Sequence, residues 1–245
     1  MKSLIARFVD FRNDDELKGM LWAAAYGFFI MFSYYILRAV RDEIAAEDRG
    51  NLQIIWTVVF LVMVFVAVPA YSWVASRYSR GVFVPLANRF FIACLIAFWL
   101  SLVILPVEAR PWIDRAFYVW TSVFALFVVT VFWGLVADCF DNDQGKRLFA
   151  FIAVGASVGG LVGSTVTALL AQQVQVFWLL LISCVPLEIA SWFARKLHQN
   201  FDTGQVRGAG ESERPLSGDA ISGMKAVFAS PYLAGIAAFI ALMTF

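Results

Sequence analysis

Charged residues are scarce in this sequence. They make up 15% of its 245 positions, compared with roughly 25% in an ordinary soluble domain, whereas hydrophobic residues make up 61%. This composition excludes a single soluble domain. The 19 Lys and Arg residues are nearly balanced by 18 Asp and Glu residues, which leaves a formal net charge of +1. The overall charge therefore gives no reason to expect a nucleic-acid partner.

Residues that carry redox, metal or catalytic chemistry are also few. The three cysteines, Cys94, Cys139 and Cys184, lie far apart and form no C-x-x-C pair, which argues against a disulfide framework or a metal knuckle. The one histidine, His198, lies in a polar stretch where we expect a solvated surface residue. No H-E-x-x-H, G-x-S-x-G or P-loop pattern is present. We therefore predict no enzymatic activity, no cofactor and no metal site.

Long uncharged runs are what the sequence has instead. Arg49 and Arg77 are separated by 27 uncharged residues, and Arg115 and Asp138 by 22, whereas a membrane-spanning helix needs roughly 20. Because lipid offers the backbone no hydrogen bonds, we expect these runs to be helices. The predicted helices cover residues 19–37, 52–75, 82–105, 117–137, 148–171 and 176–194. The fold predicted is therefore an all-α, polytopic bundle whose main partner is the lipid bilayer.

The basic residues predict the orientation of the bundle, because Lys and Arg near short loops resist translocation. An N-terminus in the cytoplasm places 13 of the 19 basic residues inside, five outside and Arg89 within the third helix. The inside group is Lys2, Arg7, Arg12, Lys18, Arg77, Arg80, Lys146, Arg147, Arg195, Lys196, Arg207, Arg214 and Lys225, and the outside group is Arg38, Arg41, Arg49, Arg110 and Arg115. We therefore expect a multi-pass protein of a bacterial inner membrane with a cytoplasmic N-terminus.

The composition changes after the sixth predicted helix. A six-helix bundle over 1–195 is followed by a polar, Gly-rich segment over 196–231, which we interpret as a cytoplasmic linker. The apolar run 232–245 has 14 residues, or about 21 Å of helix, which is less than the roughly 30 Å of a hydrocarbon core. We interpret it as the start of a seventh helix. This plan resembles the major facilitator superfamily, in which two six-helix halves enclose a central site, and implies a missing C-terminal half of the same chain as a partner.

Small residues recur along the fifth predicted helix. Gly155, Gly159 and Gly163 are spaced four apart, and a second row of small residues follows one position later. Such rows allow close contact between helices. Structural packing is the favoured interpretation, and in a carrier the same smooth face would also let helices slide during rocking.

Charges within or at the ends of the helices are the candidate functional residues, since an intramembrane charge usually faces a cavity. Arg38 and Arg41 lie on one face at the end of the first helix, and Asp42 is placed to pair with Arg38 at i, i+4. The alternative is an interfacial cap at the outer leaflet. For Arg89, function and snorkelling to the interface remain open. For Glu188, which follows Pro186, a cavity role and a buried ion pair remain open.

Two segments resemble one transporter family. Residues 34–42 read YYILRAVRD, which resembles the Y-x-I-L-R-x-x-K-D signature of the ATP/ADP translocases of plastids and intracellular bacteria, a family related to the major facilitator superfamily. Residues 132–134 read FWG and residues 145–149 read GKRLF, which resemble that family's F-W-G-x-A-N and A-K-R-F-Y motifs at the same spacing. The sequence departs from the family at Arg41, which replaces the lysine of the first motif, and at Val119, which replaces a glutamate.

The resemblance implies alternating-access exchange of a nucleoside triphosphate for a diphosphate, with basic residues holding the phosphates. We therefore predict transport of an anionic, phosphorylated small molecule, most simply a nucleotide. Arg38, Arg41 and Arg89 are the expected substrate-binding residues, and Asp42, Glu188, Asp138, Lys146 and Arg147 are the expected gating or ion-pair residues. Two alternatives remain: a major-facilitator permease for a different solute, and a non-transporting, carrier-like receptor or assembly protein.

Overall fold

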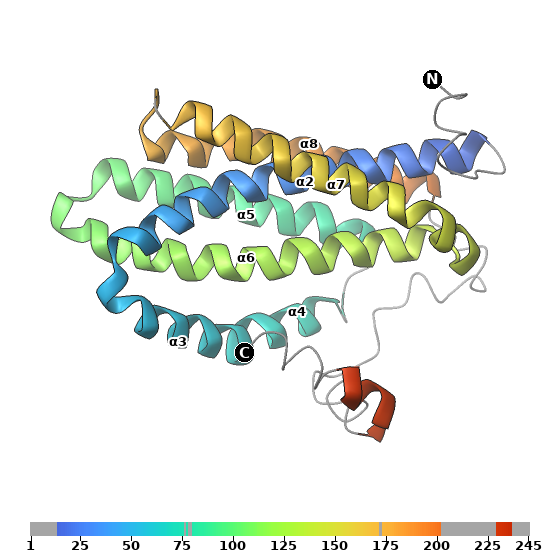
Figure 1. Ribbon diagram of the computed structural model, residues 1–245, viewed down its shortest axis with the longest axis horizontal. Helices are drawn as coiled ribbons and strands as arrows, with labels where there is room; N and C mark the ends of the chain where they lie inside the picture. Colours follow the sequence, from blue (N-terminus) through green and yellow to red (C-terminus); the bar gives the residue numbers. More distant parts are fainter. Residues whose placement is uncertain (1–13, 76, 78–79, 172, 202–228, 237–245) are drawn as a thin grey trace.

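The computed structural model describes residues 14–75, 77, 80–171, 173–201 and 229–236, and it places long helices side by side (Figure 1). The helices are α2 (Asp14–Glu47), α3 (Leu52–Val62), α4 (Val68–Ala75), α5 (Arg80–Ile104), α6 (Arg110–Cys139), α7 (Asn142–Leu170) and α8 (Val176–Phe201). Six helical segments are long and apolar enough to cross a membrane, with α3 and α4 counted as one segment. The prediction of an all-α, multi-pass membrane protein is thereby confirmed.

Several helices extend beyond their predicted ends. The first helix continues from the predicted limit at 37 to Glu47, and the last continues from 194 to Phe201. The 34 residues of α2 correspond to about 51 Å, whereas the hydrocarbon core is about 30 Å thick. Charged residues are acceptable in helices, so the first charge marks the edge of the apolar run rather than the end of the helix.

The second predicted span is interrupted rather than regular. A π-helical turn, η2 (Met63–Ala67), separates α3 from α4. Pro69 lies two residues after its end, and because proline has no backbone N–H it cannot bond to the carbonyl of Phe65, four residues earlier. The large side chains of this segment, including Trp56, Phe60 and Phe65, are exposed, as expected of a helix that faces lipid.

The packing of α2 against α7 depends on glycine. A Cβ atom added to Gly155 would lie 2.8 Å from the carbonyl oxygen of Ala24, and one added to Gly163 would lie 2.7 Å from that of Phe32. At Gly159 the added atom would overlap the carbonyl oxygen of Phe28. The glycine row therefore brings two helix backbones into contact, which is the packing role expected from the sequence.

The contacts made by the first three membrane-crossing segments correspond in part to those made by the last three. α2 packs on α7 and α8, while α6 packs on α3 and α5; in addition, α2 pairs with α6 and α5 pairs with α8. Exchanging α2 with α6, α3 with α7 and α5 with α8 maps these six pairs onto one another, whereas the smaller contacts of α6 with α8 and of α4 with α5 have no counterpart of that size. The pairing of the two halves is therefore only partly symmetric.

The segments predicted to follow the bundle fall largely outside the described residues. Of the expected linker 196–231, residues 196–201 belong to α8. Residues 231–236 are helical, and they include the first five positions of the expected seventh helix 232–245. Residues 202–228 and 237–245 are not described.

Candidate functional site

Two arginines share one carboxylate near the end of α2. The Nε and Nη2 atoms of Arg41 donate to Oδ1 of Asp42 at 3.2 and 3.0 Å, and Nε of Arg38 lies 3.6 Å from Oδ2. The expected pairing of Arg38 with Asp42 is present, but the hydrogen bonds come from Arg41. Adjacent residues do not face each other on a helix, so the sequence favoured the i, i+4 partner and missed that the long Arg41 side chain reaches its neighbour. Two guanidinium groups against one carboxylate leave a formal charge of +1.

Aromatic rings hold both arginines in place. The guanidinium of Arg41 lies 5.7 Å from the ring centroid of Tyr118, and that of Arg38 lies 5.4 Å from the ring centroid of Tyr35. The Tyr118 hydroxyl in turn accepts a hydrogen bond of 2.9 Å from Nε1 of Trp56. The Arg41 side chain is 20% exposed and that of Arg38 is 45% exposed, so an anion can reach both. Tyr118 was missed in the sequence because nothing there shows that α6 faces Arg41.

A second ion pair closes the same end of the bundle. Arg115 on α6 donates to Asp48 at 2.7 Å, and Asn51 donates to the same carboxylate at 2.7 Å. Asp48 lies between the first two membrane-crossing helices, so this contact fixes the turn between them to α6. The hydrogen bond from Arg115, followed by that from Asn51, lowers the pKa of Asp48 below its ordinary value.

The charges predicted in the third and sixth spans meet each other. Nη2 of Arg89 on α5 lies 3.7 Å from Oε1 of Glu188 on α8, although 99 positions separate them in the sequence. Their side chains are 57% and 51% exposed on the surface of the bundle. For Glu188 the two interpretations left open above were a cavity role and a buried ion pair, and the structure gives a partly exposed ion pair. Since charged groups at this depth avoid lipid, water or protein should cover this face.

An ion pair joins α2 and α7 at the opposite end of the bundle. Nη2 and Nη1 of Arg147 lie 3.2 and 3.3 Å from the two carboxylate oxygens of Glu16, and Gln144 donates to Glu16 at 3.3 Å. Gln144 also forms a capping box with Asp141 at the start of α7. The Glu16 side chain is only 8% exposed, so this is the most buried ion pair in the described part of the chain.

Of the other two gating candidates, Lys146 forms its ion pair within its own helix. Lys146 lies 3.4 Å from Asp143, three positions before it on α7, and both side chains are exposed. Asp138 is partly buried near the end of α6. Of the pair Lys146 and Arg147, which the resemblance placed in one motif, only Arg147 therefore binds a neighbouring helix.

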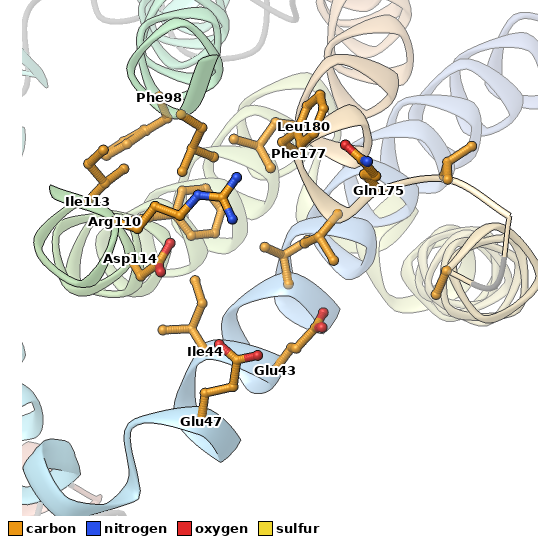
Figure 2. A pocket seen from close by; sticks show the side chains of 16 residues that line it. Glu43, Ile44, Glu47, Phe98, Arg110, Ile113, Asp114, Gln175, Phe177 and Leu180 are labelled. Carbon is orange, nitrogen blue, oxygen red and sulfur yellow. The ribbon is translucent and has the colours of Figure 1, made fainter. Parts of the chain in front are cut away.

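A cavity of about 470 Å³ lies at the Glu47 end of the bundle, by which we mean the end where α2 terminates (Figure 2). Glu43 and Glu47 of α2 border it, and so do Arg110 and Asp114 of α6. Its apolar wall includes Phe98, Phe117 and Phe177. None of the eight residues predicted as site residues lines this cavity. Its four charges sit at helix ends, where sequence reasoning treats a charge as an ordinary interfacial residue.

Comparisons with models of protein families, with curated proteins and with solved structures give no match. The fold therefore defines the class alone: an all-α protein with six helical segments that are long and apolar enough to cross a membrane.

Proposed function

We propose that this chain is the membrane-embedded part of a carrier for an anionic, phosphorylated solute, with a nucleotide exchanged by alternating access as the first candidate. The observation that carries the proposal is the pair of guanidinium groups, Arg38 and Arg41, which share the single carboxylate of Asp42. Guanidinium groups bind phosphate oxygens in bidentate fashion, and a partly exposed group with a surplus positive charge attracts an anion.

Two further observations support a carrier. The partly symmetric pairing of α2, α3 and α5 with α6, α7 and α8 is similar to the internal relation found in many transporter folds. The segments 34–42 and 132–149 resemble motifs of nucleotide translocases, and Arg38, Arg41 and Asp42 lie in the first of them.

A phosphate group would act on Arg41 by competing with Asp42. It carries more negative charge than a carboxylate and presents more acceptor oxygens. Binding would therefore transfer the Arg41 donors from Asp42 to the solute, while Tyr118 keeps the guanidinium in position. In this proposal Arg89 and Glu188, and Arg147 and Glu16, form ion pairs that break or form as the helices rock.

The test is a thermal-shift panel on the full-length protein in lipid nanodiscs. ATP, ADP, AMP and inorganic phosphate are compared with unphosphorylated solutes, since a ligand at 100 times its Kd stabilises the native state by about 2.7 kcal/mol. We expect ATP and ADP to raise the melting temperature, and Arg41→Ala to abolish that shift. Arg49→Ala, which removes an exposed arginine near the same end, is the matched control.

Each result of the panel decides between the alternatives. A shift with nucleotides that Arg41→Ala leaves intact would remove Arg41 from the site. A shift with an unphosphorylated solute alone would favour a permease for a different solute. Absence of any shift, in a protein that melts cooperatively, would favour the non-transporting receptor or assembly protein.

A further inference from the structure

We propose that the cavity at the Glu47 end binds an organic cation, a compact molecule with an ammonium group and an aromatic or other apolar body. The site does not rest on the proposed function, because none of the residues invoked for phosphate binding lines the cavity. The cavity should prefer a cation, whereas the proposed phosphate site should prefer an anion. An experiment can therefore refute either proposal without refuting the other.

The size and the walls of the cavity are those of a small-molecule site. Its volume of about 470 Å³ falls within the roughly 300–1,000 Å³ typical of ligand pockets, which are mostly apolar with a few polar groups. Residues of α2, α5, α6 and α8 and of the connection between α7 and α8 form it, so its shape is set by several rigid helices. A small organic molecule would be held on several sides, because pockets of this size bury most of a ligand's surface.

The charges around the cavity favour a cation. Glu43 and Glu47 are one helical turn apart on α2, and Figure 2 shows them across the cavity from Arg110 and Asp114 of α6. Three carboxylates against one guanidinium give a formal charge of −2. In the part of the chain that the structure describes, no cationic group lies within ion-pair distance of any of the three carboxylates. Because like charges beside an apolar wall repel one another, a cation would be attracted to this site and an anion repelled.

The arrangement favours an organic cation over a metal ion. The carboxylates border the cavity from two helices, and no cluster of three or more His, Cys, Asp or Glu residues suited to a metal occurs among the described residues. Phe98 and Phe117 instead form an edge-to-face wall, with ring centroids 5.3 Å apart and planes at 88°. Aromatic faces attract cations and pack against flat apolar groups, so the same wall accommodates both parts of the proposed ligand.

The experiment compares three molecules of nearly equal shape. 2-Phenylethylammonium, 2-phenylethanol and 3-phenylpropanoate are titrated by calorimetry into the full-length protein in nanodiscs of zwitterionic lipid, with empty nanodiscs as the blank. We expect the cation to bind at least about tenfold more tightly than the alcohol, the equivalent of about 1.4 kcal/mol, and the anion to bind more weakly than either. Equal affinities for the cation and the alcohol, or tighter binding of the anion, would overturn the proposal.

Variants place the binding in this cavity. Asp114→Asn and Glu47→Gln remove one charge each and should weaken the cation several-fold while leaving the alcohol unchanged. Glu108→Gln removes an exposed carboxylate nearby that does not line the cavity, and should have no effect. Leu102→Trp fills the cavity and should abolish binding of the cation and the alcohol.

Three outcomes of the variant series contradict the site. If Glu108→Gln weakens binding of the cation as much as Glu47→Gln does, general surface charge attracts the cation. If binding is unchanged in Asp114→Asn, Glu47→Gln and Leu102→Trp, each with a wild-type melting temperature, the cation binds elsewhere. Arg41→Ala serves as the separating control: it should remove nucleotide binding and leave the cation affinity unchanged, and loss of cation binding there would show that the two sites are one.

Discussion

Replacing Gly159 with alanine should destabilise the protein, although alanine is the better helix former. The added Cβ would overlap the carbonyl oxygen of Phe28 and lie 2.7 Å from its Cα, whereas ordinary contacts begin at 3.4 Å. The backbones of α2 and α7 must therefore separate by about 0.7 Å at the Cα, and by more at the oxygen. No side-chain rotation relieves this contact, because the atoms of Phe28 involved belong to the backbone.

The magnitude follows from two opposing effects. Overpacking of a close contact costs about 1–3 kcal/mol, and the alanine gains about 0.5–1 kcal/mol of helix stability, so the net loss should be about 1 kcal/mol from the middle of these ranges and at most about 2.5 kcal/mol. Gly160→Ala should cost less, because its added Cβ meets the ring of Tyr35, which can move. Gly50→Ala is the control, since nothing lies within 4 Å of its added Cβ, and its effect should stay within about 0.5 kcal/mol.

The assay is unfolding of the detergent-solubilised protein, followed by melting temperature and by titration with a denaturing detergent. The expected order of stability is Gly50→Ala, equal to wild type, then Gly160→Ala, then Gly159→Ala. A Gly159→Ala protein as stable as Gly50→Ala would refute the close backbone contact, and with it the packing of α7 on α2.

Three further predictions concern charge. Arg147→Met should cost about 3–5 kcal/mol, because it breaks the ion pair with the buried carboxylate of Glu16, and adding Glu16→Gln should restore part of the melting temperature. The lowered pKa of Asp48 means that its contact with Arg115 stabilises the fold above the unfolded pKa of about 4, and that this stability is lost as the pH falls through the lower pKa of the folded state. The difference in melting temperature between wild type and Asp48→Asn should therefore shrink as the pH falls below about 4; a constant difference would contradict it. If the N-terminus is cytoplasmic, Asn200→Cys should react with an impermeant thiol reagent only from the cytoplasmic side, and labelling of intact cells would reverse the orientation.

The number of membrane-crossing helices could be predicted from the sequence, because the requirement for an uncharged run of about 20 residues is local. The close packing around Gly159 could be predicted for the same reason, since a row of small residues marks a contact face without naming its partner. The ends of the helices were harder to predict from the sequence. Charged residues such as Arg41 and Arg195 mark the edge of the lipid, but their side chains do not end a helix.

The contacts between helices could not be predicted. Arg89 and Glu188 were each recognised as unusual, yet nothing in either segment shows that α5 packs on α8. Helices in lipid are apolar on most sides, so the periodicity that orients a helix in a soluble protein is weak here. The cavity was missed for this reason, because its carboxylates come from two helices whose relative rotation only the folded structure defines.

The helix α2 is continuous from Asp14 to Glu47, so its two ends should move together in a transport cycle. Between Glu16 near one end and Arg41 near the other lie 25 residue steps, or about 38 Å of helix. The glycines of α7 keep the backbones of α2 and α7 in close contact along this length. An uninterrupted helix transmits a tilt at one end to the other, whereas α3 and α4 are separated by a π turn that can absorb one. Arg41 and Asp42 are neighbours on α2, so transfer of the Arg41 donors to a phosphate group does not by itself move the helix. If the bound solute also contacts another helix and tilts α2, the tilt must be accommodated where Glu16 meets Arg147. The strength of the ion pair between Glu16 and Arg147 should therefore affect the balance between the two states of the proposed carrier. The segment α3–α4 should follow the motion least rigidly, because of its π turn.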